Sequence, residues 1–246
     1  MQLIESHQSA KYSGYMEDQK KIEAPESGKG DVVHGLAKAV LSAIPVVGGP
    51  AAELFAMVVT PPLEKRRTKW MHNVGETLNT LKEKGIDVGE LSENEAFIST
   101  VLHASQAALR THHQEKLEAL QNAVVNVAVG NAPNEDIQMM FINLVDSLTP
   151  WHIKILRFFQ NPIELGRTKG IRPEGMYMGS PSQILEQYYP ELRGQREFYD
   201  LVVRDLHARG LFTLDSLHTM MTANGTFTSR TTKLGDEFLN FISSPL

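Results

Sequence analysis

The most apolar stretch of the chain runs from Val32 to Thr60, VVHGLAKAVLSAIPVVGGPAAELFAMVVT. Its apolar residues recur at helical spacing on both sides of a central break that contains Pro45 and Gly48-Gly49-Pro50. Proline ends or kinks a helix, and Gly-Gly-Pro favours a turn, so the pattern predicts two helices that fold back on each other. Pro61 and Pro62 are expected to end the second helix. We therefore predict an apolar helical hairpin over residues 31–62.

The chain after this hairpin keeps a helical period up to residue 147. Residues 63–84 place Trp70 and several leucines at intervals of three and four, and Gly85 is expected to end that helix. The sequence Ser92-Glu93-Asn94-Glu95 predicts a capping box, followed either by one long helix to about Val129 or by two helices with a break near 111–113. Asn134 is expected to cap one more helix. These patterns predict a helical domain over residues 31–147. The polar residues 1–30 that precede it are interpreted as a flexible arm.

The pattern changes at Leu148 and predicts a second domain over residues 148–246. Helices are expected to begin at Thr149-Pro150 and Ser180-Pro181, separated by a glycine-rich loop over 160–179. A third helix over 195–209 is expected to bury Phe198, Leu201, Val202 and Leu206, and Gly210 is expected to end it. Asn224-Gly225 then predicts a β-hairpin, which is followed by a closing helix. This order is typical of a winged helix-turn-helix module.

The fold class predicted by these patterns is mainly α: an N-terminal helical bundle with an apolar hairpin, followed by a small α+β winged-helix domain. The chain has 246 residues, a net charge of −5 and no cysteine, which excludes disulfides, thiol catalysis and thiolate metal sites. The sequence has no nucleotide-binding loop and no nucleophile elbow. The pair His112-His113 with Glu115 lacks the spacing of a zinc hydrolase. We expect no enzymatic activity, no cofactor and no metal.

A winged-helix domain raises the possibility of DNA binding, and the candidate contacts are Arg196 and Arg204 on the third helix with Arg230 and Lys233 near the wing. Acidic and basic residues nearly cancel on the third helix. Because binding strength depends on how many phosphates are neutralised, the favoured interpretation is a module that contacts protein or packs within the fold. A DNA-binding regulator remains the alternative.

The apolar hairpin has a membrane interpretation and a packing interpretation. Each arm is too short to cross a bilayer as a straight helix, and Lys38 and Glu53 interrupt the arms. The hairpin is therefore expected to form the centre of the helical bundle in the resting protein. If it were released, Lys65, Arg66, Arg67 and Lys69 would lie where anionic head groups attract cations, with Trp70 suited to the interface.

The run Ala43-Ile44-Pro45-Val46-Val47-Gly48-Gly49-Pro50, followed by an apolar helix, prolines and a basic amphipathic helix, resembles the bacterial abortive-infection alpha family. The resemblance covers about residues 30–130, and Ile-Pro-x-x-Gly-Gly is its specific part. It implies a role in defence against phage, in which an infected cell stops growing or dies. The resemblance carries no catalytic residue over to this chain.

These observations lead to one functional hypothesis and one alternative. We expect a non-enzymatic anti-phage protein that is cytoplasmic, senses a phage component, forms a homo-oligomer and moves to the inner membrane to disrupt it. The expected effector residues of the hairpin and its basic flank are Lys38, Ile44, Pro45, Val46, Val47, Gly48, Gly49, Lys65, Arg66, Arg67 and Trp70. The alternative is a winged-helix transcriptional regulator that binds DNA through Arg196, Arg204, Arg230 and Lys233.

Overall fold

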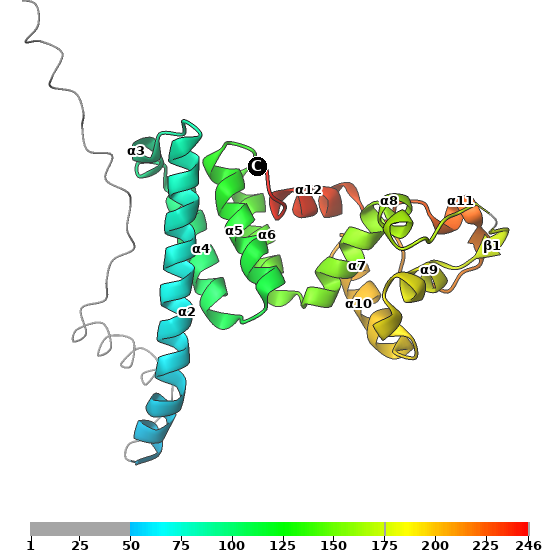
Figure 1. The fold of residues 1–246 in the computed structure, drawn as a ribbon, viewed down its shortest axis with the longest axis horizontal. Coiled ribbons are helices and arrows are strands. Elements are labelled where there is room, and N and C mark those ends of the chain that lie inside the picture. Colours follow the sequence, from blue (N-terminus) through cyan, green and yellow to red (C-terminus); the bar gives the residue numbers. More distant parts are fainter. Residues whose placement is uncertain (1–49, 175, 246) are drawn as a thin grey trace, which may run out of the picture.

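The computed structural model describes residues 50–174 and 176–245, with side chains from Met57 onward, and this part of the chain is mainly helical (Figure 1). The prediction of a mainly α fold is confirmed at this level. The expected flexible arm, residues 1–30, and the first arm of the hairpin lie outside the described residues.

The N-terminal half of the described chain is a bundle in which α4 contacts α2, α5 and α6. Both α4 and α5 bury small side chains, among them Ala104 and Ala107 on α4 and Ala123 on α5, and small side chains allow packed helices to approach closely. The helices of this half are α2 (Pro50–Glu83), α3 (Val88–Leu91), α4 (Glu95–Arg110), α5 (Gln114–Ala128) and α6 (Glu135–Ser147).

The expectation that Pro61 and Pro62 end a helix is wrong, because both prolines lie inside α2. The two prolines remove the donors that would bond the carbonyls of Met57 and Val58 one turn earlier. Both of these residues are exposed, so water can solvate their carbonyls and the helix tolerates the loss. The second arm of the predicted hairpin and the basic helix after it are therefore one continuous element.

Of the other helix ends predicted for this bundle, the structure confirms two and contradicts one. The break near 111–113 is confirmed, since α4 ends at Arg110 and α5 begins at Gln114. Asn134 caps α6 through its side chain, as predicted. The predicted capping box at Ser92 is wrong. Asn94 caps α4, because its side-chain oxygen accepts from the backbone N–H of Phe97 at 3.0 Å.

The C-terminal half contains short helices and a two-stranded antiparallel sheet. Met178 pairs with Thr222 and Gly179 pairs with Met221, and an isolated antiparallel bridge joins Phe212 to Thr231. The elements are α7 (Pro150–Gln160), α8 (Pro162–Thr168), β1 (Met178–Gly179), α9 (Pro181–Tyr188), the 3-10 helix η1 (Pro190–Leu192), α10 (Arg196–Ala208), β2 (Met221–Thr222), α11 (Ala223–Thr226) and α12 (Lys233–Phe241).

Three expectations for this half are wrong. The predicted loop over 160–179 contains α8, which Asn161 caps by accepting from the N–H of Glu164. Asn224 and Gly225 lie in α11 and not in a hairpin turn, because Thr222 caps that helical turn and β2 pairs with β1. Phe198 and Leu201 are 38% and 61% exposed, so α10 presents apolar side chains that the sequence pattern assigned to the core.

One hydrophobic core runs through both halves. The ring of Phe141 on α6 lies 5.4 Å from that of Phe238 and 5.7 Å from that of Phe241, both on α12. The closing helix therefore packs back on the N-terminal bundle. The predicted boundary at 147/148 falls between α6 and α7, and the buried cluster is continuous across it.

Candidate functional site

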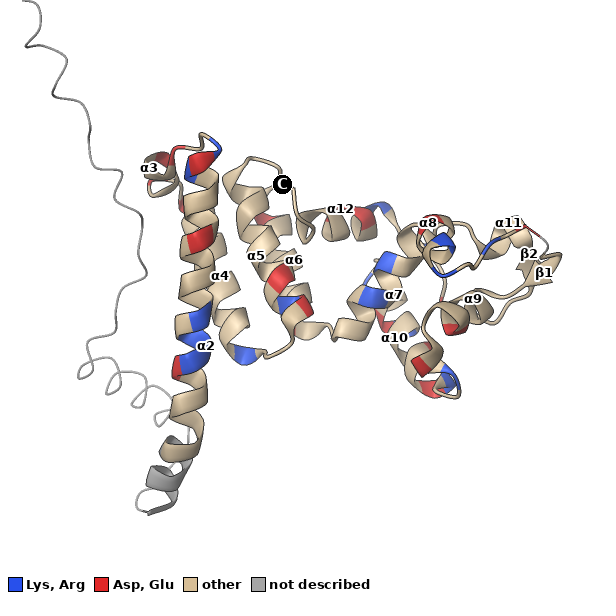
Figure 2. Cartoon of the chain, viewed as in Figure 1, with Lys and Arg blue, Asp and Glu red and all other residues tan. Residues whose placement is uncertain are grey.

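The predicted effector residues of the hairpin, Lys38, Ile44, Pro45, Val46, Val47, Gly48 and Gly49, lie outside the described residues. The basic part of the prediction is described: Lys65, Arg66, Arg67 and Lys69 form a cluster of cations on α2 (Figure 2). Lys65 and Lys69 are exposed, and Arg66 and Arg67 are half-buried. The candidate functional site is therefore the cationic segment of α2, residues 65–69, together with its neighbours.

Trp70 is not available at the surface in this structure. It is 3% exposed and packs in the core between α2 and α4. Its indole N–H donates to the Ser105 hydroxyl at 2.8 Å, and that hydroxyl donates to the Val101 carbonyl at 2.6 Å. In this conformation the indole is buried and its polar atom is bonded, and the interfacial role expected of Trp70 in a released state stays a prediction.

A groove of about 230 Å³ opens beside Trp70, where α2 meets the connection between α4 and α5. Its apolar walls come from the indole and from aliphatic residues on three elements. Three cations of α2 stand at its edge. The lining residues are Pro62, Lys65, Arg66, Lys69, Trp70, Asn73, Ala108, Thr111, His112 and Leu117.

The electrostatic character of this groove is positive. Among the described residues, no ion pair is formed by Lys65, Arg66 or Lys69. Arg66 donates to the carbonyl of Leu109 at 3.4 Å, which holds its guanidinium against the last turn of α4. Glu64, the nearest acidic residue in the sequence, does not line the groove. The arrangement favours an anionic ligand.

The N-terminal end of α2 extends past the connection between α4 and α5 (Figure 1). Met57 and Val58 on this projecting end are 66% and 71% exposed. The cations begin at Lys65, which is about 10 Å further along the helix at about 1.5 Å per residue. The helix is therefore apolar at its projecting end and cationic about two turns later.

The four candidate nucleic-acid contacts differ in how accessible they are. Arg204 is exposed, and Arg196 is exposed but lies 3.5 Å from the carboxylate of Asp200. Lys233 is exposed and lies 3.8 Å from Glu237. Arg230 donates to the Gly225 carbonyl and to the sulfur of Met221.

The guanidinium of Arg230 is therefore turned into the fold. Burial lowers the pKa of this residue, and its Nε has no hydrogen-bond partner among the described residues. Arg230 holds the segment between β2 and α12 and does not present its guanidinium to a phosphate. Sequence reasoning placed it on the wing because the predicted hairpin would have left it exposed.

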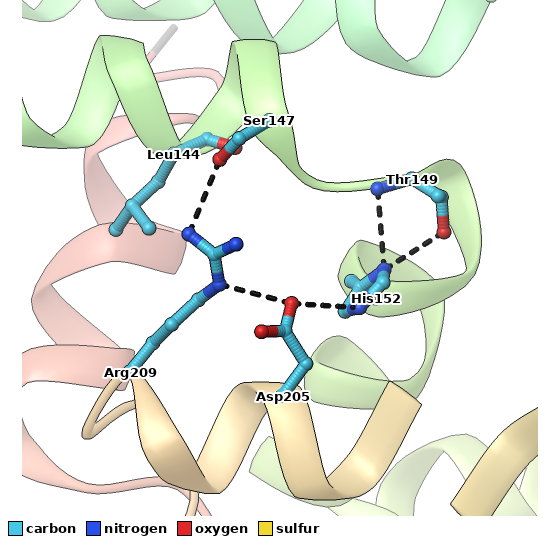
Figure 3. A network of polar contacts seen from close by, with 6 residues as sticks. All are labelled: Leu144, Ser147, Thr149, His152, Asp205 and Arg209. Carbon is cyan, nitrogen blue, oxygen red and sulfur yellow. Dashed lines mark hydrogen bonds and ion pairs between the residues drawn. The ribbon is translucent and has the colours of Figure 1, made fainter. Parts of the chain in front are cut away.

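A polar network joins the two halves next to the start of α7 (Figure 3). His152 Nδ1 accepts from the backbone N–H of Thr149 at 3.2 Å and lies 2.8 Å from its hydroxyl, while Nε2 lies 3.2 Å from Asp205. Asp205 also accepts from Arg209, which donates to Ser147 at 3.3 Å. Since Nδ1 accepts a hydrogen bond from the backbone N–H of Thr149, the imidazole caps the start of α7. Its Nε2 contacts Asp205 and so connects this cap to α10.

No group of three or more His, Asp or Glu side chains able to hold a metal occurs among residues 50–174 and 176–245. His112 and His113 lie in the connection between α4 and α5, with ring centroids 4.2 Å apart. Within the described helices, none is both long enough and apolar enough to cross a bilayer.

Comparisons with protein-family models, curated proteins and solved structures found no match. The resemblance to the abortive-infection alpha family therefore stays a prediction. The sequence identified the basic segment. It did not show that Asn73, Thr111 and His112 line a groove together with that segment. The break at 111–113 was a visible signal, but no local pattern indicates that this break lies against α2.

Proposed function

We propose that the protein is a non-enzymatic anti-phage protein of the abortive-infection type, which senses a phage component, forms a homo-oligomer and disrupts the inner membrane through the apolar segment 31–62. The single observation that supports the membrane step is the order of side chains along the projecting end of α2. Exposed Met57 and Val58 come first, and the cations from Lys65 to Lys69 follow.

The magnitudes explain why both parts of α2 are needed. Burying an apolar side chain of this size contributes about 1.5–3 kcal/mol, and a cation near an anionic surface contributes about 1 kcal/mol. Association costs at least about 4 kcal/mol in lost translational and rotational freedom. Neither the apolar end nor the cations alone would exceed that cost by much. The proposed membrane binding is therefore weak for one chain and strong for an oligomer that presents many copies.

The test is dye leakage from vesicles that contain phosphatidylglycerol, with and without lysate from phage-infected cells. Val58→Ser should lower the leakage several-fold, because it removes apolar area from the inserting end. Leu102→Ser is the matched control, since Leu102 is 57% exposed on α4, away from that end. Equal leakage from the two variants would contradict the proposal.

The part of the proposal that concerns residues 31–49 needs a test in cells. A double variant, Lys38→Glu with Gly48→Leu, should lose protection against phage. Both changes alter the proposed hairpin, one through its charge and the other at its turn. Full protection by this variant would show that the segment is not the effector.

A second candidate function, a winged-helix DNA-binding regulator, is supported by the exposed Arg204 on α10. Neutralising Arg196, Arg204 and Lys233 should then abolish a salt-sensitive mobility shift of duplex DNA and leave vesicle leakage unchanged. Arg230 is left out of this test because its guanidinium bonds the chain itself.

A further inference from the structure

We propose that the groove beside Trp70 binds the phosphate diester of an anionic phospholipid head group, which makes it a specific lipid site within the cationic segment of α2. This inference rests on the proposed membrane function and adds a ligand to it. The observations that carry it are the convergence of three cations on one groove, the apolar walls behind them and the size of the groove.

The three cations Lys65, Arg66 and Lys69 line the same groove. Lys65 and Lys69 are four residues apart and therefore share a face of α2, and Arg66 lies beside them at the same opening. Arg66 uses one N–H on Leu109, and a guanidinium has five, so donors remain for the oxygens of a phosphate. Arginine and lysine are the side chains that most often bind phosphate in proteins.

The opposite wall of the groove adds polar groups and the weaker positive potential of a helix N-terminus. Thr111 and His112 line the groove directly before α5, whose N-cap residue His113 makes no side-chain cap hydrogen bond. The N-terminus of a helix carries a partial positive charge. Asn73 supplies an amide on the α2 side. The groove therefore has the three cations and Asn73 on the α2 wall, with Thr111 and His112 on the other.

The size of the groove selects the head group and not the whole lipid. Its volume of about 230 Å³ is below the range of about 300–1,000 Å³ that is usual for pockets that enclose drug-sized ligands. Trp70 and Leu117 provide apolar contact for glycerol carbons. Pro62 lies at the groove and is one helical turn from Val58, so the acyl chains of a bound lipid would follow the exposed apolar end of α2.

The groove can be tested without a membrane, because one of its walls is fluorescent. The chain has two tryptophans, so a Trp151→Phe background leaves Trp70 as the only one. Titration with dihexanoyl-phosphatidylglycerol below its micelle concentration should change the Trp70 emission in a saturable way. Inorganic phosphate and dihexanoyl-phosphatidylcholine are the comparison ligands, and both should bind at least about tenfold more weakly.

Variants of neighbouring cations separate a site from general charge attraction. Arg66→Gln and Lys69→Gln should each weaken the soluble lipid about tenfold, as expected for loss of a charge-assisted hydrogen bond. Arg67→Gln is the matched control, because Arg67 belongs to the same basic run and does not line the groove. Lys69 is exposed, which makes its substitution safe for folding.

The outcomes distinguish this inference from the function on which it rests. An equal loss in Arg67→Gln, no saturable change in emission, or equal affinity for inorganic phosphate would overturn the lipid site. Vesicle leakage that persists in those cases would leave the proposed function in place. Saturable binding of the soluble lipid with no leakage under any condition would instead support the groove and contradict the membrane-disrupting function.

Discussion

The indole N–H of Trp70 donates to the hydroxyl of Ser105 across 2.8 Å, and this bond ties the cationic segment of α2 to α4. Ser105→Ala would leave the buried N–H without a partner, so we expect a loss of about 1–3 kcal/mol in the free energy of unfolding. Urea denaturation measures this loss. Ser99→Ala on the same helix is the control and should change stability by only a few tenths of a kcal/mol.

A double-mutant cycle tests whether the effect belongs to this pair. In a Trp70→Phe background the indole N–H is absent, so Ser105→Ala should cost much less than it does in the natural chain. Equal losses in the two backgrounds would show that Ser105 acts through its bond to the Val101 carbonyl and not through Trp70.

Asn126 is expected to hold the closing helix against the bundle. It is fully buried on α5, and its amide nitrogen lies 2.8 Å from the carbonyl of Phe241 and 2.9 Å from that of Ser243, at the end of α12. Asn126→Ala should destabilise the protein by on the order of 3 kcal/mol, because it leaves buried carbonyls without donors. Hydrogen exchange should show the amides of α12 losing protection first.

A second substitution at this position sharpens the test. Asn126→Asp keeps the shape and places a carboxylate against carbonyl oxygens, so it should destabilise more than Asn126→Ala. Asn143→Asp, at an exposed position on α6, is the matched control. A similar effect of the two aspartate substitutions would contradict the role given to Asn126.

The parts of the fold that could be predicted from sequence are those decided by contacts within a few residues. Asn134 accepts from an amide three residues later, and Gly210 adopts a φ of +72° after α10, so both signals act locally. The break before α5 is local in the same sense. For the candidate site, this kind of reasoning identified the cations of α2, because charge clusters are visible in the sequence itself.

The parts that could not be predicted depend on partners far away in the sequence. Asn224-Gly225 favours a hairpin in isolation, but β2 pairs with β1, which lies more than 40 residues earlier. The prolines of α2 are tolerated because the end of the helix projects from the bundle, which no local pattern shows. The groove has the same origin: Thr111 and Leu117 reach it only through the packing of α5 on α2.

Two glycines in helices should respond to alanine in opposite directions. A Cβ at Gly235 on α12 would overlap the backbone carbonyl oxygen of Leu211, and a backbone atom cannot move aside cheaply. Gly235→Ala should therefore cost more than about 2 kcal/mol. Gly75 on α2 has open space at its Cβ position, so Gly75→Ala should stabilise the protein by about 0.5–1 kcal/mol. Thermal unfolding of both variants provides the comparison.

His152 makes the stability of the protein depend on pH. Burial lowers the pKa of His152 below its usual value near 6.5, and the positive charges of Arg209 and Lys116 act in the same direction, while Asp205 opposes them. The unfolded chain therefore binds more protons than the folded chain at mildly acidic pH. The contribution of the neutral His152 to the free energy of unfolding should be fully present above about pH 6.5. It should decrease as the pH drops from there towards the lower pKa of the folded state.

The hydrogen bonds explain why the neutral imidazole is favoured and provide the test. A charged His152 would need a proton on Nδ1, where the backbone N–H of Thr149 already donates. His152→Gln does not titrate and keeps an acceptor at the third helical position, where glutamine is common in capping boxes. The melting temperature of this variant should fall less between pH 7 and pH 5 than that of the natural protein. His72→Gln, at an exposed position on α2, should leave the slope unchanged; an equal slope in all three proteins would show that His152 does not control this dependence.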